Sequence, residues 1–179
     1  MRGSPKGEEM ENRDLAQWKC RYRLEKREGD INSCRSPEER LTFLEDTRPY
    51  EVIEGEGNCL LNTGIDEMWD LITGDSSAHF DNSNAQIGVG DDDTTTDATQ
   101  TDLQAATNKT YKGMETGYPT STSQKATFRA SFGNAEANFA WNEWVVKQSS
   151  SGKCLNRKVD ALGTKTSGTW TLEVSITLS

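Results

Sequence analysis

The chain has 179 residues, of which 32% are hydrophobic and 27% charged, and its formal net charge is −9 at pH 7. This length fits one domain with a sizeable core, and no run approaches the roughly 20 apolar residues of a membrane-spanning helix. The first residues also lack the apolar stretch of a signal peptide, so we expect no membrane partner and a protein made and used without secretion.

The negative charge is concentrated in the middle of the chain. Residues 51–108 contain 13 acidic side chains and neither lysine nor arginine, so all 20 basic residues lie on either side of this block. An acidic block repels phosphate groups, and we therefore expect no nucleic acid as a partner. Adjacent copies of the chain could instead pair acidic with basic faces.

The four cysteines are too scattered for a zinc ribbon or a redox motif. They are Cys20, Cys34, Cys59 and Cys154. Their spacing predicts reduced, mostly buried thiols in a protein assembled in the cytosol, with no cofactor. Cys20 and Cys34 belong to no pattern that assigns them a role.

The first 49 residues are predicted to form an N-terminal arm. Residues 1–14 are polar and contain glycine and proline, as in a segment that orders only against another surface. Residues 16–24 alternate between apolar and cationic side chains, which predicts a two-faced strand. A short helix follows, because Ser36 suits an N-cap, Pro37 the first turn and Glu39 a capping box.

We expect the arm strand to add to the edge of a partner's sheet. Its expected contact residues are Trp18, Lys19, Arg21, Tyr22 and Arg23.

Residues 50–179 are predicted to form an antiparallel β-sandwich or jelly-roll-like domain. Strands are expected at 50–54, 85–90, 125–133, 138–147, 154–159 and 168–179, and a helical turn or two at 99–107.

One α-helix is predicted over residues 62–73. Ile65, Met68, Trp69 and Ile72 fall at helical spacing and Gly74 suits the C-terminal stop. We expect this helix to pack against the sheet or across an end of it. The fold class is therefore mainly β, with one packed helix and an extended N-terminal arm.

An acidic loop after residue 90 is a weak candidate for calcium. Asp91, Asp93 and Asp97 supply the hard oxygen ligands that this ion prefers. The loop lacks the spacing of an EF-hand, and a solvated loop that caps the following turn is the stronger interpretation.

No motif indicates catalysis. His79 has no nucleophile or orienting acid nearby in the sequence. Glu136, Glu143 and Asp160 could pair as acid and base, but their separation is unknown from sequence. We therefore predict that the protein is not an enzyme.

The tryptophans of the predicted strands suit core packing or a sugar-stacking platform. Trp170 fits the core, whereas Trp144 with Asn142 is a candidate for a glycan site or an interface.

Several blocks of the sequence resemble a family of small structural proteins encoded by tailed bacteriophages. The blocks are residues 57–65, 87–91, 103–109, 127–132, 136–144, 155–159 and 163–165. The resemblance covers about residues 50–179 and implies a component of the virion, with no catalytic residues to carry over.

The resemblance leads us to expect a non-enzymatic capsid decoration or cement protein on the outer capsid surface, assembled in the host cytoplasm. Its expected partners are the major capsid protein and copies of itself, since a homotrimer would match the local symmetry of a capsomer. A component of the tail, neck or fibre tip, including a module that binds host glycans, is the alternative.

Overall fold

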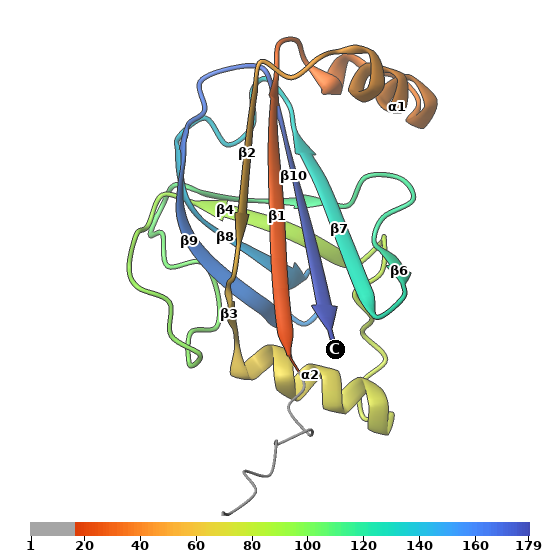
Figure 1. The fold of residues 1–179 in the computed structure, drawn as a ribbon, viewed down its shortest axis with the longest axis vertical. Helices are drawn as coiled ribbons and strands as arrows, with labels where there is room; N and C mark the ends of the chain where they lie inside the picture. Colours follow the sequence, from red (N-terminus) through yellow and green to blue (C-terminus); the bar gives the residue numbers. More distant parts are fainter. Residues whose placement is uncertain (1–16) are drawn as a thin grey trace, which may run out of the picture.

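The computed structural model describes residues 17–179 and is a two-layer β-sandwich in this range (Figure 1). One five-stranded sheet, sheet A, has the order β2-β1-β10-β7-β6, and the other, sheet B, has the order β3-β9-β8-β4-β5. All the strand pairs are antiparallel. The predicted mainly-β sandwich is confirmed.

The elements of sheet A come from both ends of the described chain. They are β1 (Trp18–Arg27), β2 (Glu51–Glu56), β6 (Thr120–Thr122), β7 (Lys125–Phe132) and β10 (Thr169–Leu178). Strict alternation of apolar and polar residues in β1 and β10 puts one face of each strand in the core.

Sheet B comes from the middle and later parts of the chain. Its strands are β3 (Cys59–Leu60), β4 (Ala85–Gly90), β5 (Lys109–Gly113), β8 (Ala140–Gln148) and β9 (Cys154–Thr164). The segment 99–107 contains no helix, so the expected helical turn there is wrong. It is a loop because two of its backbone N–H groups, at Gln104 and Ala105, donate to the Glu143 carboxylate instead of to a helical carbonyl.

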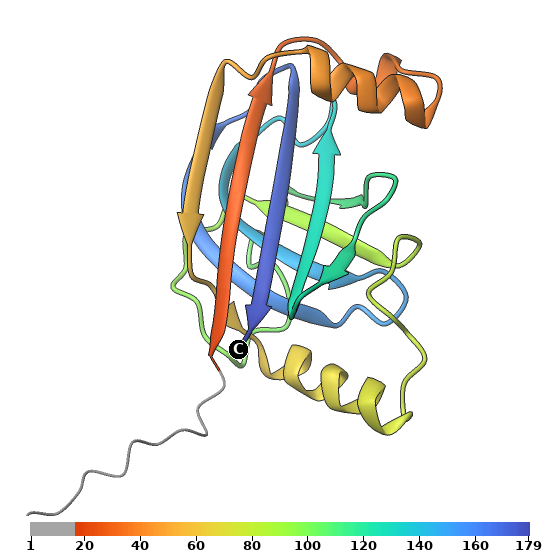
Figure 2. The ribbon, with the colours of Figure 1, turned by 45° about the vertical axis from the view of Figure 1, so that its right-hand side comes forward.

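Two α-helices lie at opposite ends of the sandwich in the described chain (Figures 1 and 2). α1 (Pro37–Asp46) begins as predicted, with the Ser36 side chain accepting from the Glu39 N–H. A 3-10 turn (Ile31–Ser33) precedes it. α2 (Asn62–Thr73) has the predicted bounds and ends at Gly74, which has the left-handed conformation of a C-cap.

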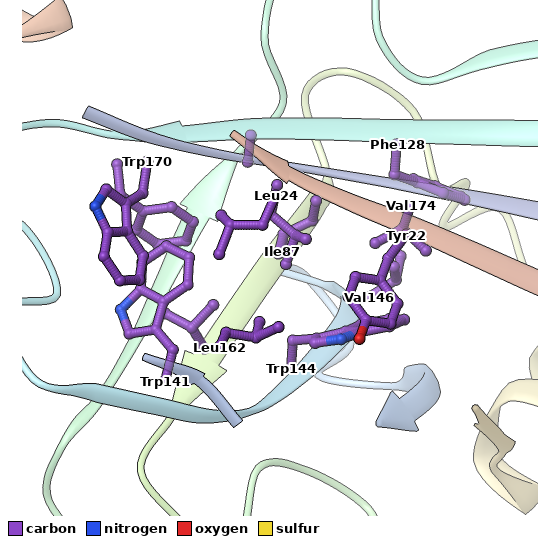
Figure 3. Packing of buried hydrophobic residues seen from close by; sticks show 14 of the residues in the cluster. Tyr22, Leu24, Ile87, Phe128, Trp141, Trp144, Val146, Leu162, Trp170 and Val174 are labelled. Atoms are coloured by element: carbon purple, nitrogen blue, oxygen red, sulfur yellow. The ribbon is translucent and has the colours of Figure 1, made fainter. Parts of the chain in front are cut away.

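The core between the sheets is rich in aromatic rings (Figure 3). Trp141 packs edge-on against both Phe132 and Trp170, with ring centroids 4.9 Å apart in each pair. Tyr22 packs edge-on against Trp144 at 5.5 Å. These contacts join β1, β7 and β10 of sheet A to β8 of sheet B, so rings from both sheets hold the layers together.

The N-terminal strand is part of this sandwich, which corrects the prediction of an arm. β1 pairs with β10 along its whole length and with β2 on its other edge. Because β2 covers residues 21–26 of its other edge, β1 is an inner strand over most of its length and leaves few backbone groups for a neighbouring sheet. Residues 1–16, which include the polar part of the predicted arm, lie outside the described range.

Candidate functional site

The residues expected to bind a partner through the arm strand are divided between the two faces of sheet A. Tyr22 is buried in the core, and its hydroxyl donates to the Asp160 carboxylate. Lys19, Arg21 and Arg23 are on the outer face, where Arg21 forms a salt bridge with Glu56 at 3.0 Å. The apolar face of this strand therefore serves the core of its own molecule.

Trp144 is not a sugar-stacking platform, because its side chain is 0% exposed. The ring lies between the sheets beside Tyr22 (Figure 3). Asn142, the residue expected to act with it, donates from Nδ2 to the Asp91 carbonyl at 2.9 Å. Trp144 is thus a core residue, and Asn142 anchors the loop that begins at Asp91.

The carboxylates of the acidic loop bond to their own neighbours. Asp91 accepts a hydrogen bond from Asn108 Nδ2 at 2.7 Å, and Asp97 accepts one from the Thr99 N–H at 2.8 Å. Hydrogen bonds from Thr99 also lower the pKa of Asp97. Residues 17–179 contain no group of three or more acidic, histidine or cysteine side chains placed to hold a metal ion. Asp91, Asp93 and Asp97 therefore do not converge on one point.

A buried ion pair on the outer side of sheet B holds this loop in place. Arg157 Nε lies 2.7 Å from Glu143 Oε2, and both side chains are fully buried. Arg157 also donates from Nη1 to the Thr94 carbonyl and to Gln100 Oε1, at 2.8 Å and 3.0 Å. Glu143 is therefore a structural anchor. The other two candidate acids are also bonded, because Glu136 pairs with Lys112 at 2.6 Å and Asp160 accepts from the Tyr22 hydroxyl.

Arg157 was not among the residues predicted from the sequence. It lies between Asn156 and Lys158, so nothing local marks it as buried, and the register that brings it beside Glu143 depends on how β8 pairs with β9.

The four cysteines are thiols, as predicted. Cys20 and Cys154 are buried, and burial raises the pKa of both, that of Cys20 to about 12. A thiol with a raised pKa is a poor nucleophile at neutral pH.

An open apolar groove of about 620 Å³ lies at the end of the sandwich that carries α2. Its apolar lining comes from β1, α2, the loop after α2, the β6–β7 hairpin and β10. We define the apolar groove by Trp18, Met68, Phe80, Pro119, Phe128 and Leu178. Leu178, near the end of β10, is 46% exposed.

α2 borders this groove and faces outward with its apolar side. The helix stripe, which we define as Ile65, Met68, Trp69 and Ile72, follows the predicted periodicity. Trp69 is 61% exposed and Ile72 is 72% exposed, whereas Gly64 and Glu67 are the buried residues of the helix. An exposed apolar face of this size is typical of an interaction surface.

The helix is turned this way because its polar side has partners in the body of the protein. Glu67 accepts hydrogen bonds from Ser76 Oγ and Gln148 Nε2, at 2.7 Å and 3.1 Å, and lies 2.5 Å from Lys153 Nζ. Burial alone would raise the pKa of Glu67, but these partners lower it. Gly64 permits the close approach, since a Cβ there would lie 2.4 Å from the Leu155 carbonyl oxygen.

Charges of opposite sign flank the groove and the stripe. One acid, Asp81, lines the groove itself, where its carboxylate accepts hydrogen bonds from the Ser83 and Asn84 N–H groups. The basic rim consists of Lys19 and Lys125, which are exposed and share one row of sheet A, because both pair with Thr177 of β10. The acidic rim consists of Asp66 and Asp70 on α2; Asp66 is exposed, and Asp70 lies 2.9 Å from Lys153.

No family model, curated protein or solved structure matches this chain. None of the helices in residues 17–179 combines the length and apolarity needed to cross a membrane. The candidate functional site is therefore defined by geometry alone: the apolar groove, the helix stripe and their two charged rims at one end of the sandwich.

Proposed function

We propose that this protein is a non-enzymatic structural component of a tailed-phage particle, specifically a decoration or cement protein on the outer capsid surface. The proposal starts from the sequence blocks that resemble small virion proteins. One structural observation supports it above the others: the ionisable side chains inside the molecule bond to loops and hold them to the sheets.

Three such clusters support a role in which the molecule keeps one shape. Arg157 and Glu143 fix the loop that follows β4, and Lys153 with Glu67 fixes α2. Arg40 of α1 lies 2.6 Å from Glu115, which joins the helix to the loop after β5. A surface that is already ordered loses little conformational entropy when it binds, which suits a protein that must cover a shell in many copies.

The expected partner on the particle is the major capsid protein. The test is cryo-electron microscopy of particles assembled with and without this gene product. Density distributed over the whole capsid surface, present only in the complete particles, is the expected result.

Two other results would contradict the decoration role. If particles without the gene product lose density from the tail, neck or fibre tip and keep an unchanged shell, the protein is a tail component. Absence of the protein from purified particles, measured by quantitative mass spectrometry, would remove it from the virion altogether.

A further inference from the structure

The apolar groove and the helix stripe are neighbours on one end of the molecule. Met68 belongs to both. Its side chain lines the groove, and Ile72 of the stripe lies one turn further along the same face of α2. An apolar groove and an exposed apolar stripe thus adjoin on one surface. We infer that this end of the sandwich binds a second copy of this chain, with the helix stripe of each copy in the apolar groove of the other.

The order of the four features makes the surface complementary to itself. Across this end lie the basic rim, the groove, the stripe and the acidic rim, because successive α2 residues are about 100° apart and place Asp66 on the far side of Trp69 from Met68. A two-fold rotation reverses this order. The stripe of one copy then faces the groove of the other, and each acidic rim faces a basic rim.

The rims favour a second copy over an unrelated partner. Two copies that carry a net charge of −9 repel each other at long range, so their contact must pair opposite charges locally. Lys19 and Lys125 provide two exposed cations at this end, and Asp66 provides an exposed acid across the groove from them. The two-fold arrangement uses both sets in each half of the contact.

This inference concerns the surface alone and goes beyond the proposed function, because it would hold wherever the protein acts. A failure of the dimer would leave the particle assignment to be decided by electron microscopy. A failure of the particle assignment would leave the dimer intact.

Sedimentation equilibrium of the full chain tests the inference. We expect a dimer of twice the 19.9 kDa chain mass, and Trp69→Lys to weaken self-association by about 30-fold or more, as for a central interface residue. Leu41→Lys is the matched control, since Leu41 is 55% exposed on α1 at the opposite end of the sandwich. Equal thermal stability of the two variants at low concentration shows that both fold.

A charge exchange tests the two-fold geometry. Lys125→Glu and Asp66→Lys should each weaken the homodimer roughly tenfold, because each places like charges across both rims. An equimolar mixture of the two variants should recover wild-type affinity, since every rim contact in the mixed dimer again pairs opposite charges.

Three results would overturn the inference. A wild-type chain that stays monomeric at about 200 µM, a concentration at which even a weak specific dimer forms, would assign the groove to another occupant. A trimer would exclude the two-fold arrangement and agree with the expected homotrimer. A dimer that Trp69→Lys and the charge variants leave unchanged would place the contact elsewhere on the molecule.

Discussion

The Arg157 side chain is fully buried, and its charge is compensated by Glu143 and by the acceptors of one loop. Replacing it with methionine leaves the Glu143 carboxylate buried without a cation. Breaking a buried pair in this way costs about 3–5 kcal/mol. We expect Arg157→Met to lower the free energy of unfolding by that amount, measured by urea denaturation.

The control for this prediction is the exposed pair on sheet A. Arg21 lies 3.0 Å from Glu56, but its side chain is 78% exposed, so Arg21→Met should change the stability very little. Equal losses in the two variants would show that burial of the Arg157 pair does not determine its contribution.

Lys165 is a buried cation whose contribution to the free energy of unfolding changes with pH in the alkaline range. Its ammonium group donates to the Gly133 carbonyl at 2.7 Å and to Asn138 Oδ1 at 2.9 Å. Burial lowers the pKa of Lys165 from its ordinary 10.5 to about 8, although Glu136 and Asp30 act in the opposite direction. Between these two values the unfolded chain holds a proton that the folded chain lacks.

The contribution of Lys165 to the free energy of unfolding should therefore rise as the pH increases from about 8 to 10.5, by up to about 1.4 kcal/mol per pH unit. The raised pKa values of Cys20 and Cys154 act in the opposite direction above pH 9, so the contribution of Lys165 is isolated by comparing two chains. In denaturant titrations at pH 8, 9 and 10, the free energy of unfolding of the wild type minus that of Lys165→Met should increase with pH, since both chains contain the same thiols. Identical slopes for the two chains would mean that Lys165 keeps its ordinary pKa.

At the scale of elements, α2 is attached through its polar side. Glu67 connects the helix to Ser76, Gln148 and Lys153, while Trp69 faces outward. We expect Glu67→Ala to destabilise the protein by about 1–2 kcal/mol, because Ser76 Oγ loses its acceptor, whereas Gln148 Nε2 keeps the Ala78 carbonyl and Lys153 keeps Asp70. Trp69→Ala should change the stability by less than about 0.5 kcal/mol at low protein concentration.

Hydrogen exchange of the backbone amides in residues 62–73 measures this difference directly. Glu67→Ala should speed exchange throughout the helix, whereas Trp69→Ala should leave it unchanged. Faster exchange in the Trp69→Ala chain would mean that the helix stripe packs against its own molecule.

α2 also shows what periodicity can and cannot predict. The spacing of Ile65, Met68, Trp69 and Ile72 predicted the helix with its bounds, and Gly74 predicted its end. The helix was expected to pack against the sheet or across an end of it, and α2 lies across one end (Figure 1), but the spacing did not predict that Trp69 and Ile72 are exposed. The polar side is buried because Gln148 and Lys153 meet Glu67, and no local pattern reveals partners some 80 residues away.

The strands follow the same rule. Alternation predicted β4 with its bounds and the whole of β10 with one residue more at each end, since burial on one face determines the identity of every second residue. It also predicted a strand near residues 16–24, but not its neighbours, because β10 is about 150 residues away. For the same reason, Trp144 was left open between core and surface until sheet A was known to cover it.

At the scale of the whole molecule, β1 is a structural strand of sheet A. It lies between β2 and β10 and contributes Cys20, Tyr22 and Leu24 to the core. We expect a chain that begins at Glu28 to be unfolded, because its core would be open and β2 would have no neighbour. The full chain, in which β1 has both neighbours, is the control.

Circular dichroism melts of the shortened chain and of the full chain check this expectation. A cooperative transition in the chain that begins at Glu28 would show that the sandwich forms without β1, as the prediction of a separate arm required.

The position of β10 has a consequence for how the protein reaches its native state. Until β10 enters between β1 and β7, each of those strands has an open edge, and the pairing of Trp18 with Leu178 closes a loop of nearly the whole described chain. Contacts this distant in sequence make folding slow, on the scale of milliseconds to seconds. During that interval the β10 of another molecule can occupy the same gap, so refolding competes with strand exchange, and the yield of monomeric sandwich should decrease as the chain is made more concentrated.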